Sequence, residues 1–317
     1  MKDERGFALI LTLLITALLV ALSVEFVNEV YVDTSARQGF VDAQQASLLA
    51  NSGIEAGNQL LQYGLNSQNY SSLADLDRLV KLLHIEDEKG TVQVTIEEES
   101  GKLNINAIVL PNGKDNDTYR PIADRLFKKL GLPPELLDAA ADWIGTNDVP
   151  RSAGAKTSYY QALKPPYAAK SGSLDTFEEL RLVKGFDGKI LERLRPYITV
   201  YPDAPGIFSA VPININTAPK ELLASLDNTM TDDLAQGIID YRKVTPLKSS
   251  TDLGNNVAGM QTLSLALASN FRIMGPQEKG AVFRLISQAQ VNETVRVIET
   301  VVRISGLQST VLYWREY

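Results

Sequence analysis

The chain has 317 residues, of which 44% are hydrophobic and 22% charged, and its formal net charge at pH 7 is −7. This composition is typical of a folded body of about two domains, and the negative charge excludes a simple electrostatic match of the whole molecule to nucleic acid or an anionic membrane surface. The chain has no cysteine, which excludes disulfides, cysteine-ligated zinc and thiol catalysis. The single histidine, His84, is interpreted as structural, because metal or acid–base chemistry needs partners that its sequence neighbours do not supply.

Residues 7–24 form an apolar run that is interrupted only by two threonines and a serine. Its 18 residues are just long enough to span a bilayer as a helix. Lys2 and Arg5 precede the run, so we expect the N-terminus in the cytoplasm and the rest of the chain across the membrane. Three interpretations are open: a secretory signal cut near Ala21-Leu22-Ser23, an uncleaved anchor, or a segment that is cut in front and kept.

The apolar pattern continues beyond this run at helical spacing and predicts one helix over residues 7–64. The positions that carry the pattern are Phe26, Val30, Phe40, Ala43, Ala46, Ala50, Ile54 and Leu61. One half of the helix is apolar on all sides and the other half is amphipathic, as expected of a stalk that packs against a globular head.

A basic leader ending in Gly6, followed by Phe7 and such a helix, resembles the type IV prepilin and pseudopilin class. The resemblance implies that a prepilin peptidase cleaves residues 1–6 off between Gly6 and Phe7 and methylates Phe7. Most members carry a glutamate as the fifth residue after the cut, whereas this chain has Leu11.

Alternating or apolar segments downstream predict strands near residues 91–97, 103–106, 271–274, 282–286, 295–304 and 311–314. The economical interpretation is one antiparallel sheet, formed by residues 65–108 and 270–317 and split by a helical insertion at residues 109–269. A short amphipathic segment is predicted near residues 73–83.

The insertion contains a weak repeat, in which residues 126–144 align without gaps to residues 180–198, and Gly131 matches Gly185. A looser third copy covers residues 222–241. Each copy is predicted to be a helical hairpin, and the region from Pro212 is similar to the helix-hairpin-helix of competence-type DNA receptors, which holds phosphate with backbone N–H groups.

The charge of the third copy argues against DNA, because residues 212–254 carry four basic and six acidic residues. The second copy, which has Gly185 and Gly188, keeps a DNA-binding interpretation open.

Over nearly its whole length the chain is similar to the K-type minor pseudopilin family of the bacterial type II secretion system. The resemblance rests on six segments in order: Ser100 to Asn106, Asp142-Trp-Ile, Tyr159-Tyr, Pro165-Pro-Tyr167, Glu178-Glu-Leu with Lys184-Gly185, and Ile213 to Ala218. It implies an α+β, type IV pilin-like fold: a long N-terminal helix packed on a small antiparallel sheet, with a large α-helical domain inserted in the sheet.

The family also lacks the N-terminal glutamate, so the resemblance makes Leu11 a marker of the pseudopilus tip. In most pilins that buried carboxylate needs a cation, which the N-terminal ammonium of a neighbouring subunit supplies. The implied partners are the I- and J-type minor pseudopilins, the prepilin peptidase, the inner-membrane secretion platform and, through residues 7–24, the lipid bilayer. The helix positions Val30, Phe40, Ala43, Ala50 and Ile54 either line the contact with the partners or pack under the chain's own sheet.

The resemblance further implies calcium in the helical domain, bound by acids that follow Asp142-Trp-Ile. Calcium takes six to eight oxygens, and the candidates here are Asp142, Asn147 and Asp148. Two departures from the family pattern oppose it: Gly145 stands where an acid is usual, and Lys156 stands where a glutamate is usual. Solvated loop acids are the alternative, and Asp115-Asn-Asp117 is interpreted as an exposed turn.

The sequence shows no catalytic serine–histidine–aspartate set, no glycine-rich phosphate loop and no HExxH motif, so we predict a protein that is not an enzyme. The prediction is a structural subunit of the secretion pseudopilus, anchored in the inner membrane with a periplasmic head. Two alternatives stay open: a tip minor pilin of a type IV pilus, and a membrane-tethered periplasmic DNA-binding protein.

Overall fold

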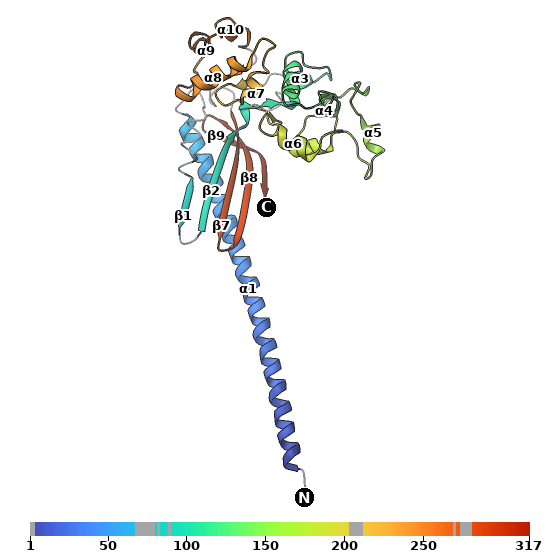
Figure 1. Cartoon of the computed structure of the whole chain (residues 1–317), viewed down its shortest axis with the longest axis vertical. Coiled ribbons are helices and arrows are strands. Elements are labelled where there is room, and N and C mark those ends of the chain that lie inside the picture. The colour runs from blue at the N-terminus through green and yellow to red at the C-terminus, as the bar shows by residue number, and fades with distance from the viewer. Residues whose placement is uncertain are drawn as a thin grey trace.

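The structure is a computed structural model of the whole chain, and it describes residues 4–66, 80, 83–87, 90–202, 212–268, 271–272 and 281–317. Lys2, most of the amphipathic segment predicted near residues 73–83, and residues 273–274 of one predicted strand lie outside the described residues. Figure 1 shows a long helix that projects from one end of the molecule, a sheet laid against its other half, and smaller helices gathered at the far end of the sheet.

Helix α1 runs without a break over Glu4–Asn66. The single long helix predicted from the apolar spacing is therefore confirmed, and at ~1.5 Å per residue it is about 95 Å long. Every described residue from 6 to 41 is exposed. Beyond them one face becomes buried at intervals of three or four residues, by Asp42, Ala46, Ala50, Gly53, Gly57 and Leu61.

The buried face of α1 packs on a five-stranded antiparallel sheet with the order β1-β2-β7-β8-β9. Its strands are β1 (His84–Asp87), β2 (Gly90–Glu98), β7 (Ala281–Val291), β8 (Thr294–Ser305) and β9 (Gln308–Glu316). Strands β2 and β7 are direct neighbours, with Thr91 opposite Gln290, although the whole insertion separates them in sequence. The predicted sheet split by an insertion is thus confirmed, and His84 lies in its edge strand.

Two glycines allow α1 to approach the sheet closely. A Cβ atom at Gly53 would overlap the hydroxyl of Ser287 and lie 2.8 Å from Cγ1 of Val92, and one at Gly57 would lie 2.8 Å from Cδ2 of Leu285. The tip of the β7–β8 hairpin adds a polar contact, since the Asn292 side chain donates a hydrogen bond to the buried carboxylate of Asp42 on α1 (3.0 Å).

Two of the predicted strands are wrong as members of this sheet. Leu103–Asn104 (β3) pairs in parallel with Ile198–Thr199 (β4), and Phe271–Arg272 (β6) pairs in parallel with Ile213–Asn214 (β5). In Leu-Asn-Ile-Asn, apolar and polar residues alternate as they do in a half-buried strand. However, Asn104 accepts a hydrogen bond from the N–H of Asn106, and this local turn ends the extended segment after two residues.

The insertion consists of short helices, which begin at Glu99, before residue 109, and form two successive halves, residues 99–202 and residues 212–268. The first half holds η1 (Glu99–Gly101), η2 (Ile105–Ile108), α3 (Tyr119–Lys129), α4 (Leu136–Ile144), α5 (Thr157–Gln161), η3 (Phe177–Leu182) and α6 (Gly188–Leu194). The second half holds α7 (Lys220–Leu223), α8 (Asp232–Val244), α9 (Ser250–Asn256) and α10 (Leu263–Ala266).

The matched glycines of the predicted repeat have the same role. Gly131 (φ 62°) and Gly185 (φ 85°) both adopt the left-handed conformation in the turn between two helical segments. The repeat is not uniform, because the first segment of the second copy, η3, is a 3₁₀ helix.

In each half of the insertion, one buried asparagine joins segments that are distant in sequence through hydrogen bonds to their backbone. In the first half Asn106 accepts a hydrogen bond from the N–H of Leu174 (2.8 Å) and donates to the carbonyls of Leu174 (3.0 Å) and Val200 (2.9 Å). In the second half Asn216 accepts from the N–H of Leu247 (2.9 Å) and donates to its carbonyl (2.8 Å). The two segments Leu103–Asn106 and Ile213–Asn216 are therefore structural equivalents, and each joins a short parallel strand pair to a helical unit.

Candidate functional site

The N-terminal part of α1 is the first candidate functional feature. Within the described residues, one helix, residues Gly6–Tyr63, is long and apolar enough to cross a membrane. Gly6, Phe7 and Leu11 all lie in its exposed N-terminal part; 70% of Phe7 and 46% of Leu11 is exposed. The helix extends back to Glu4, so the predicted boundary between a leader and a helix at residue 7 is not a boundary of secondary structure.

The five α1 positions predicted to contact either partners or the chain's own sheet fall into two groups. Val30 and Phe40 are 47% and 67% exposed and belong to neither of the two hydrophobic clusters of the described residues. Ala50 and Ile54 belong to the cluster between α1 and the sheet, and Ala43 is half-buried at the boundary. The packing under the chain's own sheet is therefore confirmed for Ala50 and Ile54, whereas the contact of Val30 and Phe40 with partners stays a prediction.

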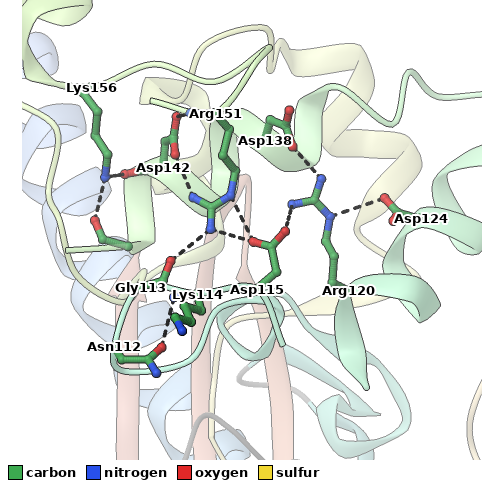
Figure 2. Close-up of polar contacts among 11 residues, drawn as sticks. Asn112, Gly113, Lys114, Asp115, Arg120, Asp124, Asp138, Asp142, Arg151 and Lys156 are labelled. Atoms are coloured by element: carbon green, nitrogen blue, oxygen red, sulfur yellow. Dashed lines mark hydrogen bonds and ion pairs between the residues drawn. The ribbon is translucent and has the colours of Figure 1, made fainter. Parts of the chain in front are cut away.

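The loop that follows α4 is the second candidate, and Figure 2 shows its polar contacts. Asp142, in the last turn of α4, is completely buried. Its carboxylate accepts two hydrogen bonds from Arg151: one from the guanidinium (2.7 Å) and one from the backbone N–H (2.9 Å). The same guanidinium donates to Asp115 (2.6 Å) and to the carbonyl of Gly113 (3.1 Å).

A lysine closes the other side of the loop. The ammonium of Lys156 donates to the backbone carbonyls of Asp142 (2.7 Å) and Gly145 (2.8 Å), and the residue is 8% exposed. Burial lowers the pKa of Lys156, and the nearby charge of Asp142 partly opposes this shift. A Cβ atom at Gly154 would overlap the carboxylate of Asp142, so the loop encloses that carboxylate without room for a side chain.

Arg120 extends the network on the side away from Lys156 (Figure 2). It contacts three carboxylates, those of Asp138 (2.6 Å), Asp124 (3.4 Å) and Asp115 (3.6 Å). Burial by itself would lower the pKa of Arg120, but the three carboxylates together raise it above its ordinary value. Asp115 thus bridges the two arginines.

The three predicted calcium ligands are not free to bind one ion: the Oδ1 atom of Asn147 lies beside Gly113 and Gly145, but the carboxylate of Asp142 is already bound. Both carboxylate oxygens of Asp142 are bonded to Arg151, whereas Asn147 and Asp148 are exposed. Among the described residues there is no group of three or more histidine, aspartate or glutamate side chains arranged to hold a metal ion. The exposed turn predicted at Asp115-Asn-Asp117 is wrong for Asn116, which is 5% exposed and accepts a hydrogen bond from the N–H of Thr118.

In the hairpin of the second copy, for which DNA binding was an alternative, the basic side chain makes contacts within the chain. Lys184, which precedes Gly185, donates to the carbonyls of Ala153 (3.1 Å) and Gly154 (3.2 Å). Its charge therefore serves to hold the loop after α4.

Comparison with known families decides what kind of protein has this fold. Two family profiles, both described as Type II secretion system (T2SS), protein K, match residues 101–203 and 213–271 and together cover just over half of the chain. The chain belongs to this family. The two matched segments coincide with the two halves of the insertion.

Several relatives agree with this assignment. The type II secretion system protein K of Pectobacterium carotovorum is 27% identical over 75% of this chain and 75% of its own. That of Pseudomonas aeruginosa is 25% identical over 94% of this chain and 88% of its own.

A chain in the crystal structure of the GspK-GspI-GspJ complex from the type II secretion system of enterotoxigenic Escherichia coli has the same fold. Its TM-score is 0.69 at 19% identity, over 90% of this chain and 99% of that one. The predicted K-type minor pseudopilin and its α+β pilin-like fold are confirmed, and neither the type IV pilus nor the DNA-binding alternative is favoured.

Two sets of residues in the head have roles that the sequence patterns do not predict. The paired asparagines stand in the segments Leu-Asn-Ile-Asn and Ile-Asn-Ile-Asn, which the sequence patterns mark as part of the family resemblance and, for the first, as a strand, but not as buried amides. No sequence pattern pairs Arg151 with Asp142; the available signal is a basic residue nine positions after an acid.

Proposed function

We propose that this minor pseudopilin is a non-catalytic subunit at the tip of the pseudopilus. There it assembles with I- and J-type minor pseudopilins, initiates or caps the filament, and supports export of folded proteins across the outer membrane. The observation that carries the proposal is the shape of the chain: at one end an exposed helical rod, residues 6–41, that is apolar as far as residue 24, and at the other a bulky two-part helical head (Figure 1). The rod fits a bundle of similar helices, whereas the head hinders regular stacking within the filament body.

Before assembly, residues 7–24 anchor the chain in the inner membrane, with the N-terminus in the cytoplasm and the head in the periplasm, where the chain meets the secretion platform. Prepilin peptidase removes residues 1–6 and methylates Phe7. The exposed position of Gly6 supports access of the peptidase.

N-terminal analysis of the membrane-purified chain tests the processing step. We expect mass spectrometry to find N-methylated Phe7 as the first residue, and Gly6→Val to leave the leader attached because the proposed cut follows a glycine. A chain that starts near Val24 would contradict the proposal, as would an intact Met1 in the unaltered protein.

Leu11→Glu tests the position at the tip. A carboxylate there would be buried in the helix bundle without a neighbour's ammonium, and burial of an unpaired charge costs several kcal/mol. We expect Leu11→Glu to reduce the amount of cargo in the medium about tenfold or more, whereas Leu11→Met leaves it unchanged. Wild-type secretion by Leu11→Glu, with the variant distributed along the filament, would disprove the argument from charge.

The contact with the I- and J-type partners is tested on the exposed half of α1. We expect Phe40→Lys to lower co-purification of the two partners at least about tenfold, while the free energy of unfolding changes by no more than about 0.5 kcal/mol. Ala50→Lys is the matched variant on the buried half, and it should instead destabilise the head, because Ala50 is fully buried against the sheet. Unchanged co-purification of Phe40→Lys would place the partner surface elsewhere.

A further inference from the structure

The loop after α4 is the place where the family resemblance implies calcium, and its oxygens are the relevant test of fit. Calcium takes six to eight oxygen ligands at about 2.3–2.6 Å, several of them carboxylate oxygens. The inward-facing oxygens here belong to the carboxylate of Asp142, the backbone carbonyls of Asp142, Gly145 and Gly113, and the carboxylate of Asp115.

Nitrogen atoms of this chain already bind these oxygens. Arg151 donates to Asp142, to Asp115 and to the carbonyl of Gly113, and Lys156 donates to the carbonyls of Asp142 and Gly145. The Arg151 side chain is 16% exposed and Lys156 is 8% exposed, so both charges lie inside the loop. A divalent cation at the same place would face two positive charges at short range in a medium of low dielectric constant.

We propose that the guanidinium of Arg151 and the ammonium of Lys156 replace a calcium ion in this chain, so that the helical domain folds independently of calcium. Two single charges on side chains supply the positive charge that the buried carboxylate of Asp142 requires. The guanidinium donates four hydrogen bonds, two of them to Asp115, and the ammonium donates two, and these six hold the loop to α4 and to the segment around Gly113. The remaining predicted ligands, Asn147 and Asp148, are exposed, so the single buried carboxylate among the three is that of Asp142, and Arg151 already binds both of its oxygens. The inference concerns folding of the head and does not depend on the proposed position at the tip.

The first experiment measures thermal unfolding of the full chain in detergent, with millimolar calcium chloride and with excess EGTA. The readout is the fluorescence of Trp143, which is 3% exposed and next to Asp142 in α4, in a background with Trp314→Phe. We expect the two transition temperatures to agree within about 1 °C. A rise of about 4 °C or more with calcium would overturn the proposal, because a ligand that binds the folded state raises its stability.

The second experiment asks whether the two cations are required. Lys156→Met keeps the length of the side chain and removes its charge, which leaves two buried carbonyls without donors. We expect its transition temperature to fall by about 5 °C or more. Lys129→Met is the matched control, since Lys129 forms an ion pair with the exposed Asp232 (2.6 Å) at the surface. Equal effects of the two variants would overturn the proposal.

A third variant reverses the replacement. Arg151→Ser combined with Lys156→Glu removes both cations and adds an acid, and we expect its transition temperature to fall in EGTA and to recover by about 4 °C or more in calcium. A double variant as stable as the native chain in EGTA would overturn the proposal. If it fails to fold, the calcium response of the native chain and the Lys156→Met comparison still decide the question.

Discussion

Gly53→Leu is expected to lower the free energy of unfolding of the head by about 3 kcal/mol, because it forces α1 away from the sheet. The Cβ atom alone would overlap the buried hydroxyl of Ser287 and lie 2.8 Å from Val92 and 3.0 Å from Val94. These atoms belong to strands β2 and β7, which form the centre of the sheet, so neither strand can yield without disturbing its neighbours. Chemical denaturation monitored by circular dichroism would measure the loss.

Gly39→Leu is the matched control for that experiment. Gly39 lies on the same helix, and an added Cβ atom there would meet nothing within 4 Å. Leucine favours a helix over glycine, so we expect a change between zero and a gain of about 1 kcal/mol. If Gly39→Leu and Gly53→Leu destabilised the protein equally, the close approach of α1 to the sheet would not be the cause.

These two glycines illustrate how far sequence reasoning reaches. The continuity of α1 was predictable, because apolar residues recur at helical spacing on both sides of Gly39 and Gly53. At the level of the sequence, each glycine is visible only as a residue of low helix propensity. The spacing does not distinguish Gly53, which contacts β2 and β7, from Gly39, which contacts nothing, since that difference depends on where the sheet packs.

The strand errors have a local physical cause. Leu103 to Asn106 alternates between apolar and polar residues, as a half-buried strand does, and no periodicity argument separates the two cases. Asparagine side chains compete with a strand for backbone hydrogen bonds. Asn104 and Asn106 are 0% and 1% exposed, so the alternation here marks buried amides and not a solvent-facing side of a sheet.

The sequence predicts some residues of the site after α4 but not the contact between them. The family resemblance implies Asp142 as a calcium ligand, and the sequence shows in Lys156 a charge that opposes calcium. The partner of Asp142 is Arg151, which reaches it only because the loop folds back over α4. A residue pair joined by such a loop closure leaves no periodic signal in the sequence.

Asn106→Ala is expected to cost about 4 kcal/mol of stability. The change leaves three buried backbone groups without a partner: the N–H and the carbonyl of Leu174 and the carbonyl of Val200. Each such group costs about 1–3 kcal/mol when its partner is removed. Asn147→Ala is the control, since Asn147 is exposed and is expected to change stability by no more than about 0.5 kcal/mol.

Asn216→Ala tests whether a buried asparagine stabilises the second half of the insertion in the same way. It removes the partner of the N–H and the carbonyl of Leu247, and we expect a loss of about 3 kcal/mol. One contiguous hydrophobic core contains residues of both halves, among them Phe127 and Ile238. Because the halves share this core, Asn216→Ala should lower the transition seen by Trp143 in the first half as well. Two separate transitions, with Trp143 unaffected by Asn216→Ala, would show instead that the duplicated halves unfold independently.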